Sequence, residues 1–192
     1  MKLPSLVALA LVLSCGLPNF SFSADIARLE WGNFIIEDDS SNGWANFKSL
    51  PSDDGRSVKM TFAPLEAKAD GSALESTSKL SGHFDIIQPE SDTYKSCDVT
   101  IVGHIIKSNA SLARLAFTIG PAKDTFEWAQ GESQSEKFTR SMTVDLSDAG
   151  RLPNPFMVSI EAYARKDGAS DAAYVSIDTI TITAADAKIA AQ

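Results

Sequence analysis

Cysteine and histidine, which often carry covalent catalysis or bind transition metals, are scarce in this chain. Its 192 residues include two of each: Cys15 and Cys97, and His83 and His104. Cys15 falls in an N-terminal apolar stretch, so a chain that loses this stretch cannot form an internal disulfide. We expect Cys97 to be a buried, unreactive thiol. The histidines lack the i, i+2 or i, i+4 spacing of zinc ligands, and alternation with apolar neighbours places both on solvent faces of strands.

The sequence also lacks the common enzyme motifs and an excess of basic residues. It contains no G-x-S-x-G nucleophile motif and no glycine-rich phosphate loop before a helix. Its 25 acidic residues outnumber 17 basic ones, for a formal net charge of −8. Such a chain is poorly suited to nucleic acid or to anionic membranes, so we expect no nucleic-acid partner. A glycoside hydrolase with paired carboxylates is an open alternative, although nothing selects a pair among so many acids.

Residues 1–23 have the pattern of a secretory signal peptide. Lys2 precedes a mostly apolar run, and Ser21-Phe22-Ser23 supplies small residues before a cleavage point. The run is short for a membrane span, so we expect a secreted or periplasmic protein without a transmembrane segment. Cleavage removes one lysine and changes the formal charge from −8 to −9. As an alternative, Val12-Leu13-Ser14-Cys15 is similar to a lipobox, which would anchor the protein through a lipid on Cys15.

What the sequence does contain is a series of short alternating segments with turn residues between them. Apolar and polar residues alternate with period two, and no segment has the period of a long helix. The pattern predicts an all-β fold, an antiparallel β-sandwich of jelly-roll type with about nine strands. We expect one domain over residues 25–184, a loop at 66–78 and a frayed tail at 185–192. Trp31 and Trp44 lie in apolar surroundings and are expected in the core.

The densest run of β-forming residues is the closing stretch, from Ala173 to Thr183. Its alternation shifts by one residue, because Val175 and Ile177 share one face whereas Ile180 and Ile182 share the other. Either the middle of this strand is buried on both faces, or a β-bulge lies near residue 178. We expect this strand to lie beside the opening strand of the chain.

A turn after the opening strand has the first half of a calcium-binding loop. Asp38, Ser40 and Asn42 carry side-chain oxygens at alternate positions, and Gly43 permits a sharp turn. Ser49 stands where an EF-hand requires a bidentate glutamate, so an EF-hand is rejected. Two interpretations remain open: an ordinary solvated turn, or a calcium site completed by a distant strand.

The two ends of the chain resemble extracellular jelly-roll carbohydrate-binding modules of the galactose-binding-like type. The resemblance rests on three segments: Trp31-Gly32-Asn33-Phe34-Ile35-Ile36-Glu37, Asn42-Gly43-Trp44 and Val175-Ser176-Ile177-Asp178-Thr179-Ile180. In that family an acid of the opening strand and the aspartate of the closing strand commonly bind a structural calcium. The resemblance therefore implies calcium as a cofactor, held by Glu37 and Asp178.

A sugar-binding surface needs exposed aromatic rings with hydrogen-bonding groups beside them, because pyranose faces stack on flat rings. Tyr163 lies opposite the apolar face of its strand, between Glu161 and Arg165, and is the first candidate. Trp128, in a short strand bounded by loops, is the second. A tyrosine at the edge of the core with a solvated hydroxyl is the alternative for Tyr163.

Three functions follow from these observations. The first is a secreted, non-catalytic β-sandwich binding protein for glycans. The second is a structural or partner-binding protein of the cell envelope that uses its sheet edges or faces on extracellular proteins. The third is a hydrolase on a jelly-roll scaffold. The oligomeric state is not predicted by any of these patterns.

Overall fold

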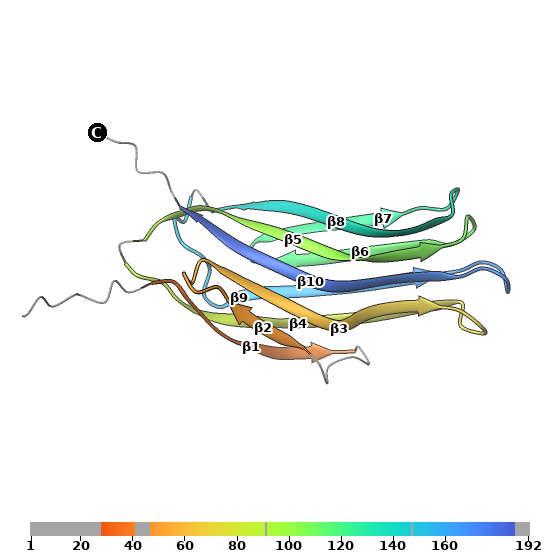
Figure 1. Cartoon of the computed structure of the whole chain (residues 1–192), viewed down its shortest axis with the longest axis horizontal. Coiled ribbons are helices and arrows are strands. Elements are labelled where there is room, and N and C mark those ends of the chain that lie inside the picture. The colour runs from red at the N-terminus through yellow and green to blue at the C-terminus, as the bar shows by residue number, and fades with distance from the viewer. Residues whose placement is uncertain (1–27, 41–46, 91, 147, 187–192) are drawn as a thin grey trace, which may run out of the picture.

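The computed structural model describes residues 28–40, 47–90, 92–146 and 148–186, which form a sandwich of two five-stranded sheets (Figure 1). The first sheet has the strand order β1-β4-β9-β6-β7, and the second has the order β2-β3-β10-β5-β8. The ten strands of these residues are β1 (Glu30–Asp39), β2 (Lys48–Pro51), β3 (Ser57–Ala69), β4 (Glu75–Ile87), β5 (Tyr94–Lys107), β6 (Leu112–Ile119), β7 (Ala122–Trp128), β8 (Gln134–Asp145), β9 (Phe156–Arg165) and β10 (Ala173–Asp186).

Every strand pair is antiparallel, and the chain crosses repeatedly from one sheet to the other. The prediction of an all-β, antiparallel sandwich of jelly-roll type is confirmed. The prediction that the closing strand pairs with the opening strand is wrong. β10 is the central strand of the second sheet, between β3 and β5, whereas β1 is an edge strand of the first sheet and pairs with β4.

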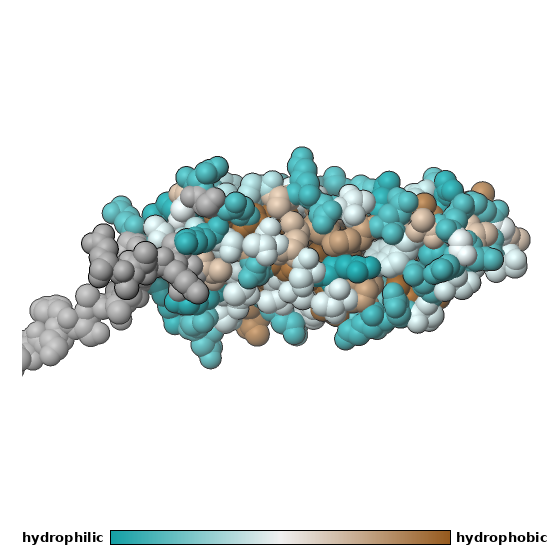
Figure 2. All heavy atoms as spheres, turned by 90° about the horizontal axis from the view of Figure 1, so that it is seen from above, coloured by the Kyte–Doolittle hydropathy of each residue, from teal (hydrophilic) through white to brown (hydrophobic). Residues whose placement is uncertain are grey.

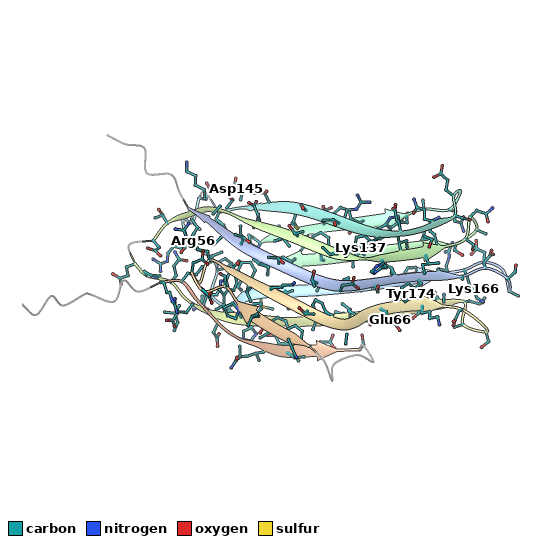
Figure 3. All side chains as sticks on the ribbon, viewed as in Figure 1. Arg56, Glu66, Lys137, Asp145, Lys166 and Tyr174 are labelled. Carbon is teal, nitrogen blue, oxygen red and sulfur yellow. The ribbon has the colours of Figure 1, made fainter. Side chains whose placement is uncertain are left out.

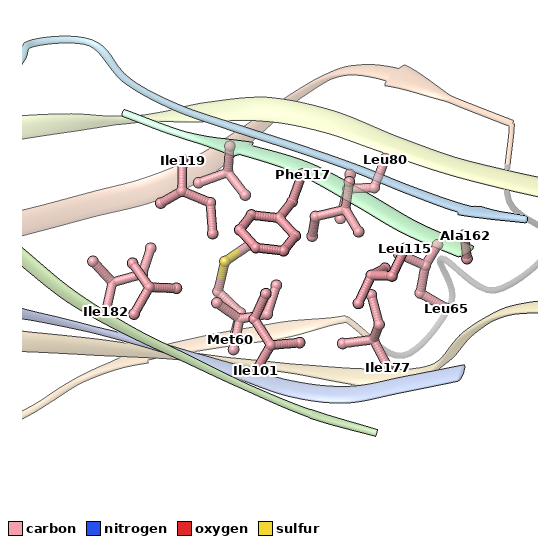
Figure 4. Close-up of a cluster of buried hydrophobic side chains, with 14 of the residues drawn as sticks. Met60, Leu65, Leu80, Ile101, Leu115, Phe117, Ile119, Ala162, Ile177 and Ile182 are labelled. Carbon is pink, nitrogen blue, oxygen red and sulfur yellow. The ribbon is translucent and has the colours of Figure 1, made fainter. Parts of the chain in front are cut away.

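The inward-facing side chains of the two sheets form one apolar core between them (Figure 4). Met60, Ile101 and Ile177 of the second sheet meet Leu115 and Phe117 of the first, and all five are at most 3% exposed. The period-two alternation creates this arrangement, because alternate residues of each strand point to the same side.

Two residues expected in the core are found there. The indole of Trp31 packs edge-on against Phe84 and Phe156, at 5.5 Å between ring centroids in each case, and its Nε1 donates a hydrogen bond to the Gly55 carbonyl. Cys97 is fully buried, and burial raises the pKa of its thiol to about 12. Trp44 lies outside the described residues.

The predicted loop at 66–78 is wrong. β3 continues to Ala69 and β4 begins at Glu75, so only a turn at 70–74 separates them. Ala67 and Ala69 are buried while Glu66 and Lys68 are exposed, which is a strand alternation in which alanine replaces a larger apolar residue. Alanine is a weak strand former, so the sequence pattern alone did not identify this segment.

The phase shift in the closing strand is a β-bulge. Between Ile177 and Thr179, β10 changes register with both of its neighbours. Against β5, those two residues pair with the consecutive residues Gly103 and Val102, so Asp178 is the extra residue. As a result Ile177 and Ile180 both point into the core, and each is fully buried.

The ends of the chain lie mostly outside the described residues, including the predicted signal peptide and residues 187–192. β10 continues through Ala185 and Asp186, which pair with Ser96 and Tyr94, so the strand extends two residues into the predicted tail. Within the described ranges, no helix is both long and apolar enough to pass through a lipid bilayer.

Candidate functional site on the outer face of the first sheet

The outer face of the first sheet is formed by the alternate, outward-pointing residues of β4, β9 and β6. The strand register aligns these residues in rows across the sheet. In one row Lys79, Glu161 and Ala116 are neighbours, and in the next row Thr77, Tyr163 and Arg114 are neighbours. A third row, on the other side of the first, contains Ser81, Ser159 and Thr118.

Small side chains at the centre of this face leave a shallow hollow of about 250 Å³. Ala116, Thr118 and Ser159 form part of its lining, and the longer Lys79 and Glu161 also border it. On the β7 side the hollow is bordered by Lys123, Asp124 and Thr125. Its walls therefore present hydroxyl, carboxylate and ammonium groups within one small area.

Tyr163 lies one row away from this hollow and is held by two neighbouring strands. Its hydroxyl donates a hydrogen bond to Glu75 Oε2 at 3.2 Å, and the Arg114 guanidinium lies 5.1 Å from the centre of its ring. Partial burial raises the pKa of the Tyr163 hydroxyl, and the Glu75 carboxylate raises it further to a smaller extent. The hydroxyl is therefore protonated and able to donate at neutral pH. Arg114 Nη2 also bonds Glu161 Oε1 at 3.3 Å, which joins the tyrosine to the hollow.

The structure therefore brings Glu161 and Tyr163 together, as the sequence predicted, but it turns Arg165 elsewhere. The Arg165 Nε lies 3.5 Å from Asp167 Oδ1, in the turn that follows β9. Arg114 takes the place beside Tyr163 that was expected for Arg165. Sequence analysis missed Arg114 because the pairing of β6 with β9 is not visible in a single strand pattern.

The prediction of Trp128 as an exposed platform is wrong. Its side chain is 5% exposed and points into the core, where its ring lies 4.9 Å from that of Phe138. The guanidinium of Arg140 lies 5.8 Å from the Trp128 ring and 5.3 Å from that of Phe126. β7 is exposed at most other positions, so its sequence showed too little alternation to reveal which side of the strand is buried.

The residues implied as calcium ligands are not together. Glu37 Oε1 bonds His83 Nδ1 at 2.9 Å on the outer face of the first sheet, whereas Asp178 Oδ2 lies 3.1 Å from His104 Nδ1 on the outer face of the second. The core separates these two faces, so the prediction that Glu37 and Asp178 share an ion is wrong. The described residues contain no group of three or more His, Cys, Asp or Glu side chains able to hold a metal.

The acidic turn itself is only partly described. Asp38 Oδ2 accepts a hydrogen bond from Lys79 Nζ at 2.9 Å, and this contact raises the pKa of Lys79. The backbone N–H of Ser40 donates to the Lys79 carbonyl, while Asn42 lies outside the described residues. Calcium binding at this turn stays a prediction, and its test is a melting temperature that falls when a chelator is added.

A second hollow lies at one end of the sandwich. It has a volume of about 550 Å³ and is bordered mainly by the apolar residues Pro121, Leu146, Ala149, Leu152 and Pro153, together with Asp145, Asp148 and Arg151. None of these side chains is aromatic. This hollow therefore lacks the flat ring on which a pyranose stacks.

Comparisons with known proteins find distant structural likeness only. No protein-family model matches the chain, and no curated protein matches it. Similar solved structures include a CBM61 carbohydrate-binding module in complex with β-1,4-galactotriose, at 10% identity and a TM-score of 0.35, covering 81% of this chain and 90% of that one. Another is the C-terminal CBM6 module of a laminarinase from Zobellia galactanivorans, at 15% identity and a TM-score of 0.28, covering 79% and 99%.

A third similar structure is a CBM36 module in complex with calcium and xylotriose, at 15% identity and a TM-score of 0.30, covering 82% of this chain and all of that one. Carbohydrate-binding modules, the class that the two ends of the sequence resemble, thus occur among proteins with a similar β-sandwich. At these identities and TM-scores the likeness carries no argument about ligand or function.

Proposed function

We propose that this chain is a secreted, non-catalytic binding protein that recognises glycans on the outer face of the first sheet. The observation that supports the proposal most is the arrangement of Tyr163 beside the small hollow at Ala116 and Ser159. An aromatic ring held by two strands lies next to a depression lined with polar groups. This combination suits a sugar, which has an apolar face and a rim of hydroxyl groups.

Two of the charged groups around the hollow, Lys79 and Glu161, are held in ion pairs. Lys79 bonds Asp38, and Arg114 bonds Glu161. Each pair offers donors and acceptors to sugar hydroxyls without a net charge. In the proposed complex one sugar ring of the glycan stacks on Tyr163. The neighbouring sugar unit of the same glycan places its hydroxyl groups in the hollow.

Affinity electrophoresis and isothermal titration against xylan, mannan, β-1,4-galactan, laminarin and polygalacturonate would test the proposal. We expect binding to at least one of these polymers, and Tyr163→Ala should weaken it about tenfold or more, because a central aromatic contact is commonly worth about 1.5–3 kcal/mol. Tyr163→Phe keeps the ring and should retain most of the affinity. Glu136→Gln on β8 is a surface control.

Two results would contradict the proposal. One is the absence of binding to every polymer, and the other is binding that Tyr163→Ala leaves unchanged. Measurement of reducing ends released from the same polymers tests the alternative of a hydrolase, since a binding protein releases none.

One observation favours the second candidate function, a protein that binds other envelope proteins. The edge strands β1 and β2 expose apolar side chains on the same side of the sandwich, with Ile35 and Ile36 each 45% exposed and Leu50 71% exposed. Exposed apolar residues on edge strands suit the addition of a partner's strand. The double variant Ile35→Lys and Leu50→Lys should abolish recovery of an envelope partner without changing glycan binding.

The secreted location is part of the proposal. Cleavage after Ser23 leaves a mature chain that begins at Ala24, whereas lipid anchoring leaves it beginning at Cys15. The N-terminal residue of the protein purified from its native source distinguishes the two outcomes.

A further inference from the structure

A second tyrosine occupies the equivalent position on the opposite side of the sandwich. Tyr174 lies on β10, the central strand of the second sheet, as Tyr163 lies on β9, the central strand of the first. The two strands are consecutive, and a turn at 166–172 joins them. Tyr174 points outward, because its neighbours Ala173 and Val175 are buried in the core.

The surroundings of Tyr174 are similar to those of Tyr163. Burial and the nearby carboxylate of Glu66 on the adjacent strand β3 raise the pKa of its hydroxyl, as burial and Glu75 on β4 do for Tyr163. Ser176, the next outward residue of β10, is 1% exposed and is the register partner of Glu66. The Tyr174 ring therefore lies near a carboxylate from a second strand. Figure 3 labels Glu66 and Tyr174 close together on this face, and Lys137 on β8, which is separated from β10 by β5.

An apolar neighbour enlarges the surface of this ring. Ile106 on β5 is the register partner of Tyr174, and its side chain is 48% exposed. Tyr174 and Ile106 together make a small apolar area in the middle of a solvent-facing sheet. An apolar area at such a place is unusual, because the outer face of a sheet is normally covered by polar residues.

The charges around this area balance. Lys68 and Lys137 contribute two positive charges, and Glu66 and Asp178 contribute two negative ones. Lys68 bonds Asp70 at 2.7 Å and Asp178 bonds His104 at 3.1 Å, so two of these four groups are already paired. Two rows from Tyr174, the face carries the hydroxyl groups of Thr61, Thr139 and Thr179, with Val102 in the same row. A neutral, hydroxyl-rich polymer complements such a face better than a polyanion or a polycation does.

We propose that the outer face of the second sheet is a second glycan-binding surface, centred on Tyr174 and Ile106, and that the chain is therefore bivalent. The inference rests on the proposed function of the first face. The two tyrosines point away from each other across a core about 10 Å thick. One extended glycan cannot contact both rings, so a single protein molecule holds two glycan chains together.

The first test counts binding sites. Wild-type protein is titrated calorimetrically with hexasaccharides derived from xylan, mannan and β-1,4-galactan, each separately. We expect two sites per chain for the sugar that binds, one site in Tyr163→Ala, one in Tyr174→Ala and none in the double variant. Tyr174→Phe, which keeps the ring, retains both sites.

The second test measures cross-linking. Wild-type protein mixed with the soluble polysaccharide should raise light scattering, with a maximum where the number of protein sites matches the number of binding positions on the polysaccharide. Tyr163→Ala and Tyr174→Ala, each alone, should abolish the rise. Ile106→Glu places a charge on the second face at a position that is already half exposed, so it tests the same surface without disturbing the core. It should remove one site and the cross-linking.

The outcomes separate this inference from the proposed function. Suppose that the wild type has one glycan-binding site per protein chain, that Tyr163→Ala removes it, and that Tyr174→Ala and Ile106→Glu bind glycan as the wild type does. This result overturns the second surface and leaves the first intact. One site that depends on Tyr174 alone supports the second surface and overturns both bivalency and the first surface. Failure of the wild type to bind these hexasaccharides and every polymer used to test the proposed function overturns both proposals.

Discussion

Replacement of Gly103 by alanine offers a direct test of how closely the central strands approach each other. Gly103 lies on β5, opposite Ile177 of β10 on one side and Phe138 of β8 on the other. A Cβ atom added at this glycine would lie 2.0 Å from the carbonyl oxygen of Ser176 and 2.7 Å from Cζ of Phe138. The first contact is with backbone, so it cannot be relieved by the rotation of a side chain.

The expected cost follows from these distances. A carbon and an oxygen that are not bonded normally stay more than about 3 Å apart, so β5 and β10 must separate by about 1 Å at the bulge. Adding a methyl group to a packed core commonly costs about 1–3 kcal/mol. Because the clash here involves backbone and an aromatic ring together, we expect a loss of about 3 kcal/mol in the free energy of unfolding. For a domain of this size that lowers Tm by about 6–12 °C.

Urea denaturation followed by tryptophan fluorescence, together with calorimetry, would measure the loss. Gly71→Ala is the matched control: Gly71 has a φ of +51°, and no atom lies within 4 Å of the added Cβ. This control should cost only about 1 kcal/mol, which is the backbone penalty for a left-handed residue. A loss below about 1 kcal/mol for Gly103→Ala would show that the strands are not as close at the bulge as described.

Two other predictions concern the core and its covering. Burial raises the pKa of the Cys97 thiol from 9.0 to about 12, so the folded protein favours the neutral thiol. The stability that the neutral thiol contributes is fully present below pH 9. It is lost as the pH rises from 9 towards 12, because the unfolded chain then releases the proton more readily. At pH 8 a thiol reagent should therefore label Cys97 very slowly in the native protein and completely in urea; rapid native labelling would contradict its burial. Arg140→Ala removes the guanidinium that lies over Phe126 and Trp128, and should lower the free energy of unfolding by about 1 kcal/mol and shift tryptophan emission to longer wavelength. An unchanged spectrum would show that Arg140 does not shield the indole.

The sequence predicted the fold class because strand alternation is a local property. Each strand whose inward positions are large apolar residues was recognised, for example at Val58 and Met60 or at Phe156 and Val158. The second half of β3 was missed because its inward residues include the alanines Ala67 and Ala69. These alanines are buried because the facing sheet covers them, and a local sequence pattern cannot predict that contact.

The candidate site was predicted only in part for a similar reason. Alternation along β9 correctly placed Glu161 and Tyr163 on the outward side of the strand. The third member, Arg114, comes from β6, which becomes a neighbour of β9 only through the order of strands in the sheet. Strand order depends on long-range pairing, so a single sequence indicates which residues face outward but not which of them meet.

The bulge at Asp178 shows how one local irregularity organises the second sheet. The extra residue allows Val175 and Ile177 on one side of it, and Ile180 and Ile182 on the other, to point into the same core. Both neighbouring strands must adapt: β5 presents Gly103 at the closest approach, and β3 places residues 62–64 between the partners of Ile177 and Thr179. The Asp178 carboxylate lies on the outer face of the second sheet beside His104, whereas Glu37 lies on the first sheet, so the two cannot share a site. The bulge therefore keeps the apolar side of the central strand continuous, and the aspartate at the bulge, which the resemblance implied as a calcium ligand, lies beside His104 instead.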